Sequence, residues 1–562
     1  WLKPFLVKLR RLSLGSTVLR RARLAAPFLR MASPSPQAFA FIFPMASGHI
    51  NPSLPIARSL VAMGHQVHYL CREQMRSAIE DTGAVFHSDV EVEPELYSSR
   101  APDFMGAMES LKKEFGLDAE TVTPLEAMLK LRPVQLELML PGVLRWLRRL
   151  EAAAVMYCPL MNLEAAVAAQ VLGIPSVALL TTAGPGFAPR TFEEFFSMCG
   201  MSKEQAREMC LSFEPKLEAT RRMNSQYGLD LEDLEGFEPF GMLEVLARSS
   251  ATLVTTSEDL QDPVPEELAE AYARLGVRFE YVGPLLDADG SQRAAGHKFT
   301  GADNAAGHGS SESSAEVVAL VREARERGRS VVVASMGTVI TGDSPDLGWE
   351  GLLPDADGKR YGLTGRELCR GVWGAAFDAF GAEEAEAGPL IVVSLGPQED
   401  ALGELKAPAN AVCYRAIPQV DVLKAGVDLF LTHGGQNSFT EGLAHGVPLV
   451  VCPGFGDQAV NARKAEALGV GLQVARPMPE EEDVAAATAA YREEVAAALR
   501  RTHAEPGFRE AARAAAQRLA SPGGVSRAVE VTLEVAAQKS VDVKLVVPSA
   551  APAVLSVGFA GA

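Results

Sequence analysis

The chain has 562 residues, of which 48% are hydrophobic and 22% are charged, and its formal net charge is −18. This length is about three times that of a typical single domain, so we expect two domains with additional segments. The negative charge argues against a nucleic-acid-binding protein, whose contact surface should be basic. An anionic ligand would have to be attracted by local groups, because the field of the whole protein would repel it.

Cysteine and histidine usage gives no sign of a disulfide framework or a metal site. The seven cysteines form no CxxC pair, which favours a reducing compartment and excludes a cysteine-rich zinc site. The histidines outside the motifs described below show no metal-ligand spacing: His65, His68, His87, His297, His308, His445 and His503. No apolar run approaches the ~18–20 residues needed to cross a bilayer. We therefore expect a cytoplasmic protein with no metal cofactor and no membrane span.

Residues 1–36 form a basic extension with eight Lys or Arg and no acidic residue. The Leu, Ala and Ser residues between these charges resemble an organellar transit peptide. The alternative is sequence upstream of the true start, because the chain begins with Trp1 and Met31 offers a plausible initiator. Both interpretations stay open.

From residue 37 the chain alternates short apolar runs with helical patterns. The strands expected in the first half are 38–44, 66–70, 175–182, 251–256 and 278–285, with a helix over 51–64. Those expected in the second half are 330–338, 390–396, 411–417, 427–433 and 448–454. Short β-branched runs bounded by Gly and Pro are typical of strands buried on both faces of a parallel sheet.

Two segments interrupt this alternation. Residues 286–314, rich in Gly, Ala, Ser and Asp, indicate a flexible linker, and residues 341–362 an irregular insertion. The sequence therefore predicts an α/β protein with two Rossmann-like domains facing a cleft. The predicted domains are 37–285 and 315–506, followed by C-terminal helices and a tail at 507–562. In such sheets, ligands bind beyond the carboxyl ends of the strands.

The most informative segment is the turn after the strand expected at 427–433. Gly434 and Gly435 let a ligand approach the main chain closely, and a helix is expected to begin two or three residues later. The N–H groups and the dipole at a helix start form a ready site for a phosphate. Because residues 430–460 contain no Lys or Arg, a diphosphate would be bound by main-chain N–H groups and by three side chains. These are His433, Asn437 and Ser438.

A purely structural alternative exists for the same segment. Ser438 and Glu441 have the spacing of a capping box, in which each side chain bonds the main chain of the other residue at the start of a helix. In that case the two side chains would only stabilise the helix start.

The pattern THGGQNSxxEGLxxGVPxxxxPxxxDQxxNA over residues 432–462 resembles the signature block of the family 1 glycosyltransferases. This family includes plant and microbial UDP-sugar transferases that act on natural products. The resemblance implies the GT-B architecture, with the acceptor domain first and the donor domain second. It also implies hexosyl transfer with a UDP-sugar as co-substrate and no metal. The helical stretch at 507–537 would pack back across the cleft.

Matching positions carry donor-binding roles over to this chain. The resemblance implies that the diphosphate is bound by His433, Gly435, Asn437 and Ser438, the ribose by Glu441, and the transferred sugar by Asp457 and Gln458. Gln419 matches the position that contacts the uracil edge. Ser335 and Thr338 match a loop near the diphosphate.

One position departs from the family pattern in this half of the chain. Ala416 stands where the family usually has an aromatic residue that stacks on uracil. Base–aromatic stacking is worth ~1–3 kcal/mol, so either donor affinity is lower or Tyr414 supplies the ring.

The segment FPMASGHINP (43–52) resembles the family's first loop and helix, and places His49 at the position of the catalytic base. Gly48 and Asn51 flank this residue on the acceptor side. A histidine suits the task because its ordinary pKa lies near 6.5, and general-base catalysis contributes ~100- to 10,000-fold. A single displacement would invert the anomeric centre. Alternatively, His49 only lines a turn, and Asn51 caps a helix that Pro52 opens.

A second departure concerns the partner of this histidine. Cys158 stands where many members have an Asp that orients the imidazole. A neutral thiol cannot stabilise an imidazolium as a carboxylate does. Asn162 or Glu164 could take over that role, or His49 could act unaided.

Residues 90–250 are expected to build the acceptor pocket, and Met- and Phe-rich stretches such as 192–201 suit a lipophilic molecule. The predicted function is therefore inverting transfer from a UDP-sugar to a hydroxyl of a small lipophilic acceptor. A lipid-linked N-acetylglucosaminyl transferase and a non-catalytic nucleotide-sugar-binding paralogue remain as alternatives.

Overall fold

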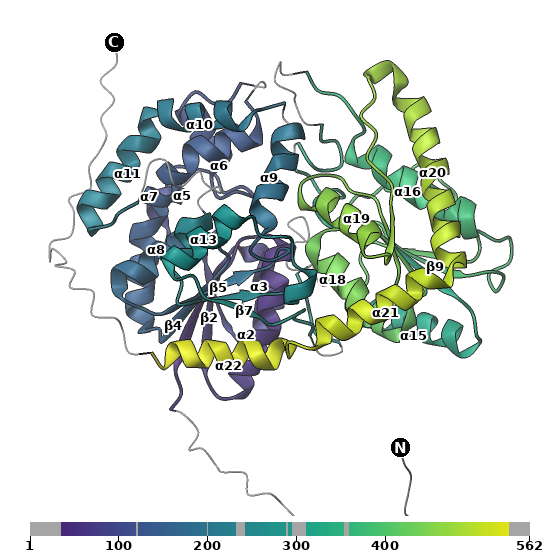
Figure 1. Ribbon diagram of the computed structural model, residues 1–562, viewed down its shortest axis with the longest axis horizontal. Coiled ribbons are helices and arrows are strands. Elements are labelled where there is room, and N and C mark those ends of the chain that lie inside the picture. Colours follow the sequence, from purple (N-terminus) through teal and green to yellow (C-terminus); the bar gives the residue numbers. More distant parts are fainter. Residues whose placement is uncertain are drawn as a thin grey trace, which may run out of the picture. The chain divides into compact units, whose positions relative to one another are not determined.

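Two parallel β-sheets, one from each half of the chain, organise the computed structural model (Figure 1). The structure describes residues 35–119, 122–198, 200–231, 242–287, 290–294, 311–344, 346–352 and 359–538. The predictions for residues 1–34, for His297 and His308, and for the C-terminal tail lie outside these ranges.

The first sheet has the strand order β3-β2-β1-β4-β5-β6-β7, and all of its pairs are parallel. Its strands are β1 (Ala38–Ile42), β2 (Gln66–Cys71), β3 (Val85–Ser88), β4 (Ala154–Tyr157), β5 (Ser176–Leu180), β6 (Ala251–Val254) and β7 (Phe279–Tyr281). The second sheet has the order β10-β9-β8-β11-β12-β13, again all parallel. Its strands are β8 (Val331–Ser335), β9 (Leu390–Ser394), β10 (Ala411–Tyr414), β11 (Leu429–Thr432), β12 (Leu449–Val451) and β13 (Gly471–Gln473).

Helices connect the strands in both halves. Those of the first half are α1 (Ser47–Ile50), α2 (Leu54–Ala62), α3 (Arg76–Glu80), α4 (Asp89–Val92), α5 (Pro94–Tyr97), α6 (Met108–Glu114), α7 (Pro124–Leu150), α8 (Leu163–Leu172), α9 (Phe187–Met198), α10 (Lys203–Ser212), α11 (Glu214–Tyr227), α12 (Met242–Ala247) and α13 (Glu266–Leu275). Those of the second half are α15 (Ser311–Glu326), α16 (Gly365–Phe380), α17 (Gln419–Gly426), α18 (Gln436–Ala444), α19 (Asp457–Ala467), α20 (Val484–Ala504), α21 (Pro506–Ala520) and α22 (Gly524–Ala536).

Burial of both sheet faces explains why the strands are continuous apolar runs. In β1, Ala40 and Ile42 face the core that contains Trp146 of α7. Phe39 and Phe41 face the opposite core, which contains residues of α2 and α22. Because successive side chains of a strand point to opposite faces, a strand covered on both sides consists mostly of apolar residues.

The order of the strands reverses at one point in each sheet. In the first sheet β1 lies between β2 and β4, and in the second β8 lies between β9 and β11. At such a switch point the two adjacent connections leave in opposite directions and open a crevice at the carboxyl ends of the strands. The segments following β1, β4, β8 and β11 are therefore the places where this fold accommodates a ligand.

All ten predicted strands are present, nine with shorter bounds and β2 with one additional residue. The helix predicted over 51–64 differs, because α1 begins at Ser47 and a 3₁₀ turn at Asn51–Ser53 separates it from α2. The insertion predicted at 341–362 is partly packed, since Trp349 is buried with its ring centroid 6.2 Å from that of Trp373 in α16. Part of this insertion, 353–358, lies outside the described residues.

The C-terminal helices connect the second half of the chain back to the first. Residues of α21 pack in the same core as α18, whereas Val531 and Val535 of α22 pack with Phe39 of the first sheet. The main-chain N–H of Gly524 also donates to the carbonyl oxygen of Val282, 2.7 Å away. Figure 1 shows α22 lying beside α2, at the face of the first sheet.

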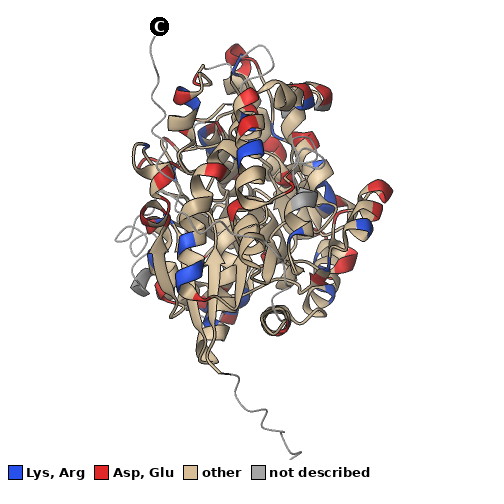
Figure 2. Ribbon diagram, turned by 90° about the vertical axis from the view of Figure 1, so that its left-hand side faces the viewer, with Lys and Arg blue, Asp and Glu red and all other residues tan. Residues whose placement is uncertain are grey.

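Figure 2 shows acidic and basic residues interspersed over the helices on the side that faces the viewer. Many of them form ion pairs, such as Arg145 with Glu95 and Arg222 with Glu137. Among the described residues, no helix is both long and apolar enough to cross a membrane.

Candidate functional site

The segments after β1 and β11 meet at the two switch points. The side-chain amide of Asn437, in the first turn of α18, donates to the carbonyl oxygen of Gly48, 2.8 Å away. Ser47 Oγ lies 2.8 Å from Thr338 Oγ1, in the loop after β8. The Gly-rich turn of the second half therefore faces the Gly48-His49 loop of the first half.

The turn after β11 forms a shallow cradle around one imidazole. Gly434 adopts a φ of +83°, and Gly435 is the N-cap residue of α18. A Cβ atom added at Gly435 or at Gly337 would lie 2.5 Å or less from the His433 ring. Glycine is required at both positions because the ring lies between the two main-chain segments. Gly435, Asn437 and Ser438 at the start of α18 are only partly buried.

The capping-box alternative is wrong, because Ser438 lies inside α18 and the carboxylate of Glu441 binds two other side chains. Gln419 Nε2 donates to Glu441 Oε2 at 2.7 Å and to Ser438 Oγ at 3.2 Å. Arg293 Nη2 donates to Glu441 Oε1 at 2.7 Å. The structure thus brings together Gln419, predicted to contact uracil, Glu441, predicted to bind the ribose, and Ser438, predicted to bind the diphosphate.

Arg293 was not among the predicted site residues. It belongs to residues 290–294, which we call the strap. This segment is part of the predicted flexible linker, and it makes specific contacts with both halves of the chain. Asn51 binds the main chain of Ala294 through both its amide nitrogen and its amide oxygen, at 3.0 and 2.8 Å. The Gly290 N–H donates to Asp421 of α17 at 3.1 Å. The alternative that Asn51 caps a helix is therefore wrong, since its side chain fixes this strap beside Glu441.

His49 is partly buried in α1, and its Nδ1 has two neighbours on adjacent strand ends. Cys158 Sγ, after β4, lies 3.3 Å away, and Thr181 Oγ1, after β5, lies 3.2 Å away. Thr181 was missed by the sequence prediction. Neither Asn162 nor Glu164 replaces the missing carboxylate, because Asn162 Nδ2 instead donates to Glu164 Oε1 at 2.8 Å.

Burial keeps the site histidines neutral. It lowers the pKa of His49 to about 4 and, despite opposing contributions from Ser335 and Glu441, lowers the pKa of His433 to about 4. Burial also raises the pKa of the Cys158 thiol to about 12, so this residue is uncharged at neutral pH. His49 can therefore accept a proton, and His433 can donate a neutral N–H hydrogen bond.

The remaining predicted donor residues surround the cradle. Asp457 is the first residue of α19, and burial raises its pKa to about 6, although the main-chain N–H of Gln436 hydrogen-bonds its carboxylate. Gln458 is buried, and its Oε1 accepts from the N–H groups of Gly454 and Phe455 at 2.8 and 3.3 Å. Ser335 ends β8, and its main-chain carbonyl oxygen accepts a hydrogen bond from the main-chain N–H of His433 at 3.4 Å. These contacts shape the site, and the predicted roles in sugar binding stay predictions.

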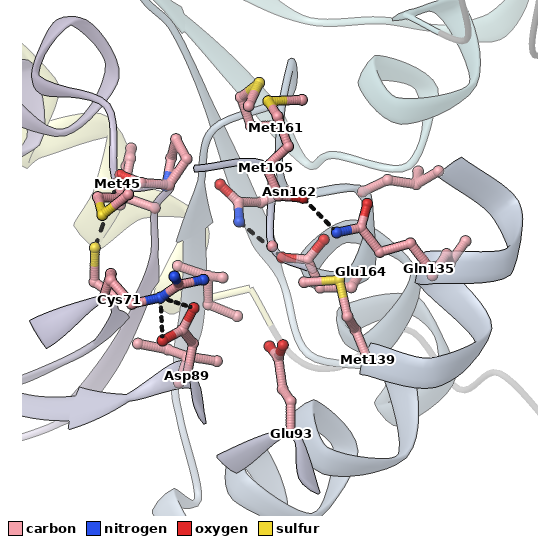
Figure 3. A pocket seen from close by; sticks show the side chains of 18 of the residues that line it. Met45, Cys71, Asp89, Glu93, Met105, Gln135, Met139, Met161, Asn162 and Glu164 are labelled. Carbon is pink, nitrogen blue, oxygen red and sulfur yellow. Dashed lines mark hydrogen bonds and ion pairs between the residues drawn. The ribbon is translucent and has the colours of Figure 1, made fainter. Parts of the chain in front are cut away.

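A cavity of about 90 Å³ lies beside the His49 loop in the first half (Figure 3). Its lining includes Phe43, Pro44 and Met45, just before α1, and Leu160–Asn162, just after Cys158. Six methionines contribute to its wall: Met45, Met105, Met108, Met128, Met139 and Met161. The predicted Phe-rich stretch at 192–201 is not part of this lining. These flexible, apolar methionine side chains lie near the loop of His49, and they suit one end of a lipophilic acceptor.

Comparisons with known proteins agree with this geometry. Residues 403–496 match the family described as UDP-glucoronosyl and UDP-glucosyl transferase. The chain is 24% identical to the NDP-glycosyltransferase YjiC of Bacillus licheniformis over 429 residues, which cover 76% of this chain and 82% of that protein.

Two solved structures share the fold. The glycotransferase of kitacinnamycin superposes with a TM-score of 0.54 at 22% identity, covering 89% of this chain and 99% of that one. CalG4, the calicheamicin glycosyltransferase, gives a TM-score of 0.56 at 18% identity, covering 89% and 98%. The two parallel sheets and these superpositions show the GT-B fold, and residues 403–496, which include the turn after β11, are similar to the UDP-glycosyltransferase family.

Proposed function

We propose that this enzyme transfers a hexosyl group from a UDP-sugar to a hydroxyl of a small lipophilic acceptor, with inversion and without a metal ion. The observation that carries the proposal is the contact between Asn437 and Gly48. It brings the cradle at the start of α18 next to the loop that carries His49. A donor diphosphate bound at the cradle would therefore present its sugar to an acceptor held beside this histidine.

The proposed reaction is a single displacement. His49 Nε2 takes the proton from the acceptor hydroxyl while the acceptor oxygen forms a bond to the anomeric carbon. The bond from that carbon to the diphosphate oxygen breaks, and UDP leaves with the bonding electron pair. Thr181 Oγ1 and Cys158 Sγ, both close to Nδ1, can accept a hydrogen bond from Nδ1–H, and in that tautomer Nε2 carries the lone pair that takes the proton.

The charge that develops on the diphosphate would be stabilised by main-chain N–H groups of α18, by the helix dipole and by neutral His433. Gln419 and Glu441 would bind the uracil edge and the ribose hydroxyls. Asp457 and Gln458 would bind the hydroxyls of the transferred sugar.

The experiment that tests this function measures UDP release from UDP-glucose with a panel of phenolic, sterol and macrolide acceptors, in the presence of EDTA. We expect acceptor-dependent UDP release that the chelator does not reduce, and a β-linked product from the α-linked donor. TDP-glucose serves as the comparison donor, because Ala416 removes the usual stacking ring. Loss of activity in EDTA that Mg²⁺ restores would contradict the metal-independent mechanism.

The acid limb of the pH profile should lie unusually low. Because burial lowers the pKa of His49 to about 4, its protonated form is disfavoured and the base form predominates above that pH. We expect kcat/KM to stay constant as pH falls from 8 to about 5 and to decline only below it, since kcat/KM reports the groups of the unliganded enzyme. A decline centred above pH 6 would show that His49 titrates normally.

Replacing Cys158 by Asp should raise turnover on the order of tenfold, the equivalent of one pKa unit. A carboxylate at this position, close to Nδ1, would stabilise the imidazolium that forms in the transition state. The acid limb of the profile should move to higher pH in the same variant. Cys158→Asn is the matched control, because it has a similar shape and no charge. Equal turnover in wild type and Cys158→Asp would mean that Thr181 already orients the base sufficiently.

The segment that forms the cradle, residues 430–460, contains no Lys or Arg. We expect Arg293 to supply a positive charge to the diphosphate bound there. Once ribose hydroxyls occupy Glu441, the Arg293 guanidinium can exchange its carboxylate partner for a phosphate. Arg293→Gln should weaken UDP binding about tenfold, as expected for a lost charge-assisted hydrogen bond, and leave uridine binding unchanged, as measured by calorimetry. Tighter UDP binding in this variant would show instead that the strap competes with the donor.

A further inference from the structure

The cavity beside the His49 loop is lined by charged side chains as well as by methionines. Arg72 is buried there, and its Nε lies 2.9 Å from Asp89 Oδ2. Its Nη2 donates to the hydroxyl of Tyr97 at 2.9 Å. Arg72 and Asp89 therefore form an ion pair at one side of the cavity, and their charges neutralise each other.

A second carboxyl, that of Glu164, lies on the α8 side. Burial raises its pKa to about 7, whereas the hydrogen bond from Asn162 and the positive charge of Arg132 in α7 act in the opposite direction. Arg132 also lines the cavity. Arg132 thus supplies a positive charge that acts on Glu164.

Glu93 is the third carboxyl; the positive charge of Arg72 opposes the rise of its pKa but is outweighed by burial and by the neighbouring acidic groups. Its residue is only 1% exposed, and its Oε2 is buried with no hydrogen-bond partner among the residues that the structure describes. Figure 3 shows the Glu93 carboxylate pointing into the space between Asp89 and Glu164. Its main-chain carbonyl accepts from the N–H groups of Leu96 and Tyr97, which fixes the residue at the start of α5.

A buried carboxyl group without a hydrogen-bond partner destabilises the folded protein unless a ligand binds to it. Burying a polar group without a hydrogen bond is unfavourable, because the group loses its hydration and gains no partner. Burial and the neighbouring charges of Asp89 and Glu164 raise the pKa of Glu93 well above its ordinary value. The side chain is therefore protonated while the cavity lacks a cation, and it would ionise when a cation enters.

We propose that this cavity binds an ammonium group of the acceptor against Glu93, so that the acceptor class is a lipophilic amino alcohol or a phenol with an aminoalkyl side chain. This inference rests on the proposed function, since it names the acceptor of the same site. With one ammonium group bound, three carboxylates would face three cations: Arg72, Arg132 and the ligand.

The size and position of the cavity fit this assignment. A volume of about 90 Å³ holds a group of a few heavy atoms, so the body of the acceptor extends out of it. Met45 and Leu160 of the lining lie a few residues from His49 and Cys158 in the sequence, and His49 Nδ1 is 3.3 Å from Cys158 Sγ. An acceptor anchored by its amine would therefore place its other end, with the reacting hydroxyl, toward the base.

The test compares two ligands that differ in one group, 6-(aminomethyl)-2-naphthol and 6-(hydroxymethyl)-2-naphthol. Calorimetry measures the affinity of each ligand for the whole chain at pH 7, with no sugar donor present. We expect the amine to bind at least about tenfold more tightly than the alcohol, as a desolvated charge-assisted contact predicts. Glu93→Gln should abolish this difference. Glu95→Gln is the matched control, because Glu95 belongs to the same helix but pairs with Arg145 at the surface, and it should leave the preference unchanged.

A second measurement needs no variant. Repeating the amine titration in buffers of different ionisation enthalpy should show release of about one proton per amine bound and none for the alcohol, because Glu93 ionises on binding. Equal affinity of the two ligands for wild type, a preference that survives Glu93→Gln, or the absence of proton release would overturn the proposal. Failure of the glycosyl transfer itself would appear separately, in the UDP-release assay, because these titrations contain no donor.

Discussion

Replacing His49 by Ala is expected to lower the turnover number by about 100- to 10,000-fold, the usual contribution of a general base. The imidazole has no substitute nearby. Its two polar neighbours, Cys158 and Thr181, carry a thiol and a hydroxyl that do not accept a proton at neutral pH. UDP affinity should change little, because His49 belongs to the first half of the chain and the cradle to the second. Steady-state kinetics and UDP titration measure the two effects.

Chemical rescue separates a catalytic role from a structural one. Added imidazole should restore part of the turnover of His49→Ala, because a small base can enter the space that the side chain leaves. A variant that loses UDP binding together with turnover would place His49 in the donor site. A variant that retains full turnover would remove it from the mechanism.

Replacing His433 by Ala should weaken UDP binding about 10- to 100-fold, the value of a lost hydrogen bond to a charged group. The ring lies between Gly337 and Gly435, so its removal also leaves a gap in the cradle. Uridine, which lacks phosphates, should bind wild type and His433→Ala almost equally. The difference between the two ligands, measured by calorimetry, reports the diphosphate contribution alone.

His503→Ala is the control for this variant. His503 lies near the end of α20 in the same half of the chain, where its ring centroid is 5.2 Å from that of Phe380. It contributes packing and no contact to the cradle, so UDP affinity should be unchanged. Equal UDP affinity in wild type and His433→Ala would remove His433 from the donor site.

The sequence predicted the fold well because most strands are buried on both faces and therefore read as short apolar runs. The edge strand β3 was missed for the opposite reason, since its sequence Val-Phe-His-Ser is only partly buried. The other missed edge strand, β13, has three residues and offers no periodicity. Edge strands in general carry weaker hydrophobic signals than central ones.

The candidate site was predicted where its residues lie within one segment, as in residues 432–462. Residues that reach the site from elsewhere were not found. Arg293 lies in a Gly- and Ala-rich stretch with no periodic signal, and tertiary hydrogen bonds such as those of Asn51 to Ala294 and of Gly290 to Asp421 place it next to Glu441. Thr181 did have a signal, because it follows β5, the neighbour of β4, at the carboxyl end of the sheet. Polar residues at that edge are candidates in any fold of this class.

The position of a bound nucleotide tests the central claim most directly. In a crystal structure of the wild-type chain with UDP and without divalent metal, the account predicts the diphosphate at the start of α18. Its oxygens should lie within hydrogen-bond distance of main-chain N–H groups of that first turn and of the His433 ring. A diphosphate bound away from this turn, or bound there only through an added metal ion, would contradict the account.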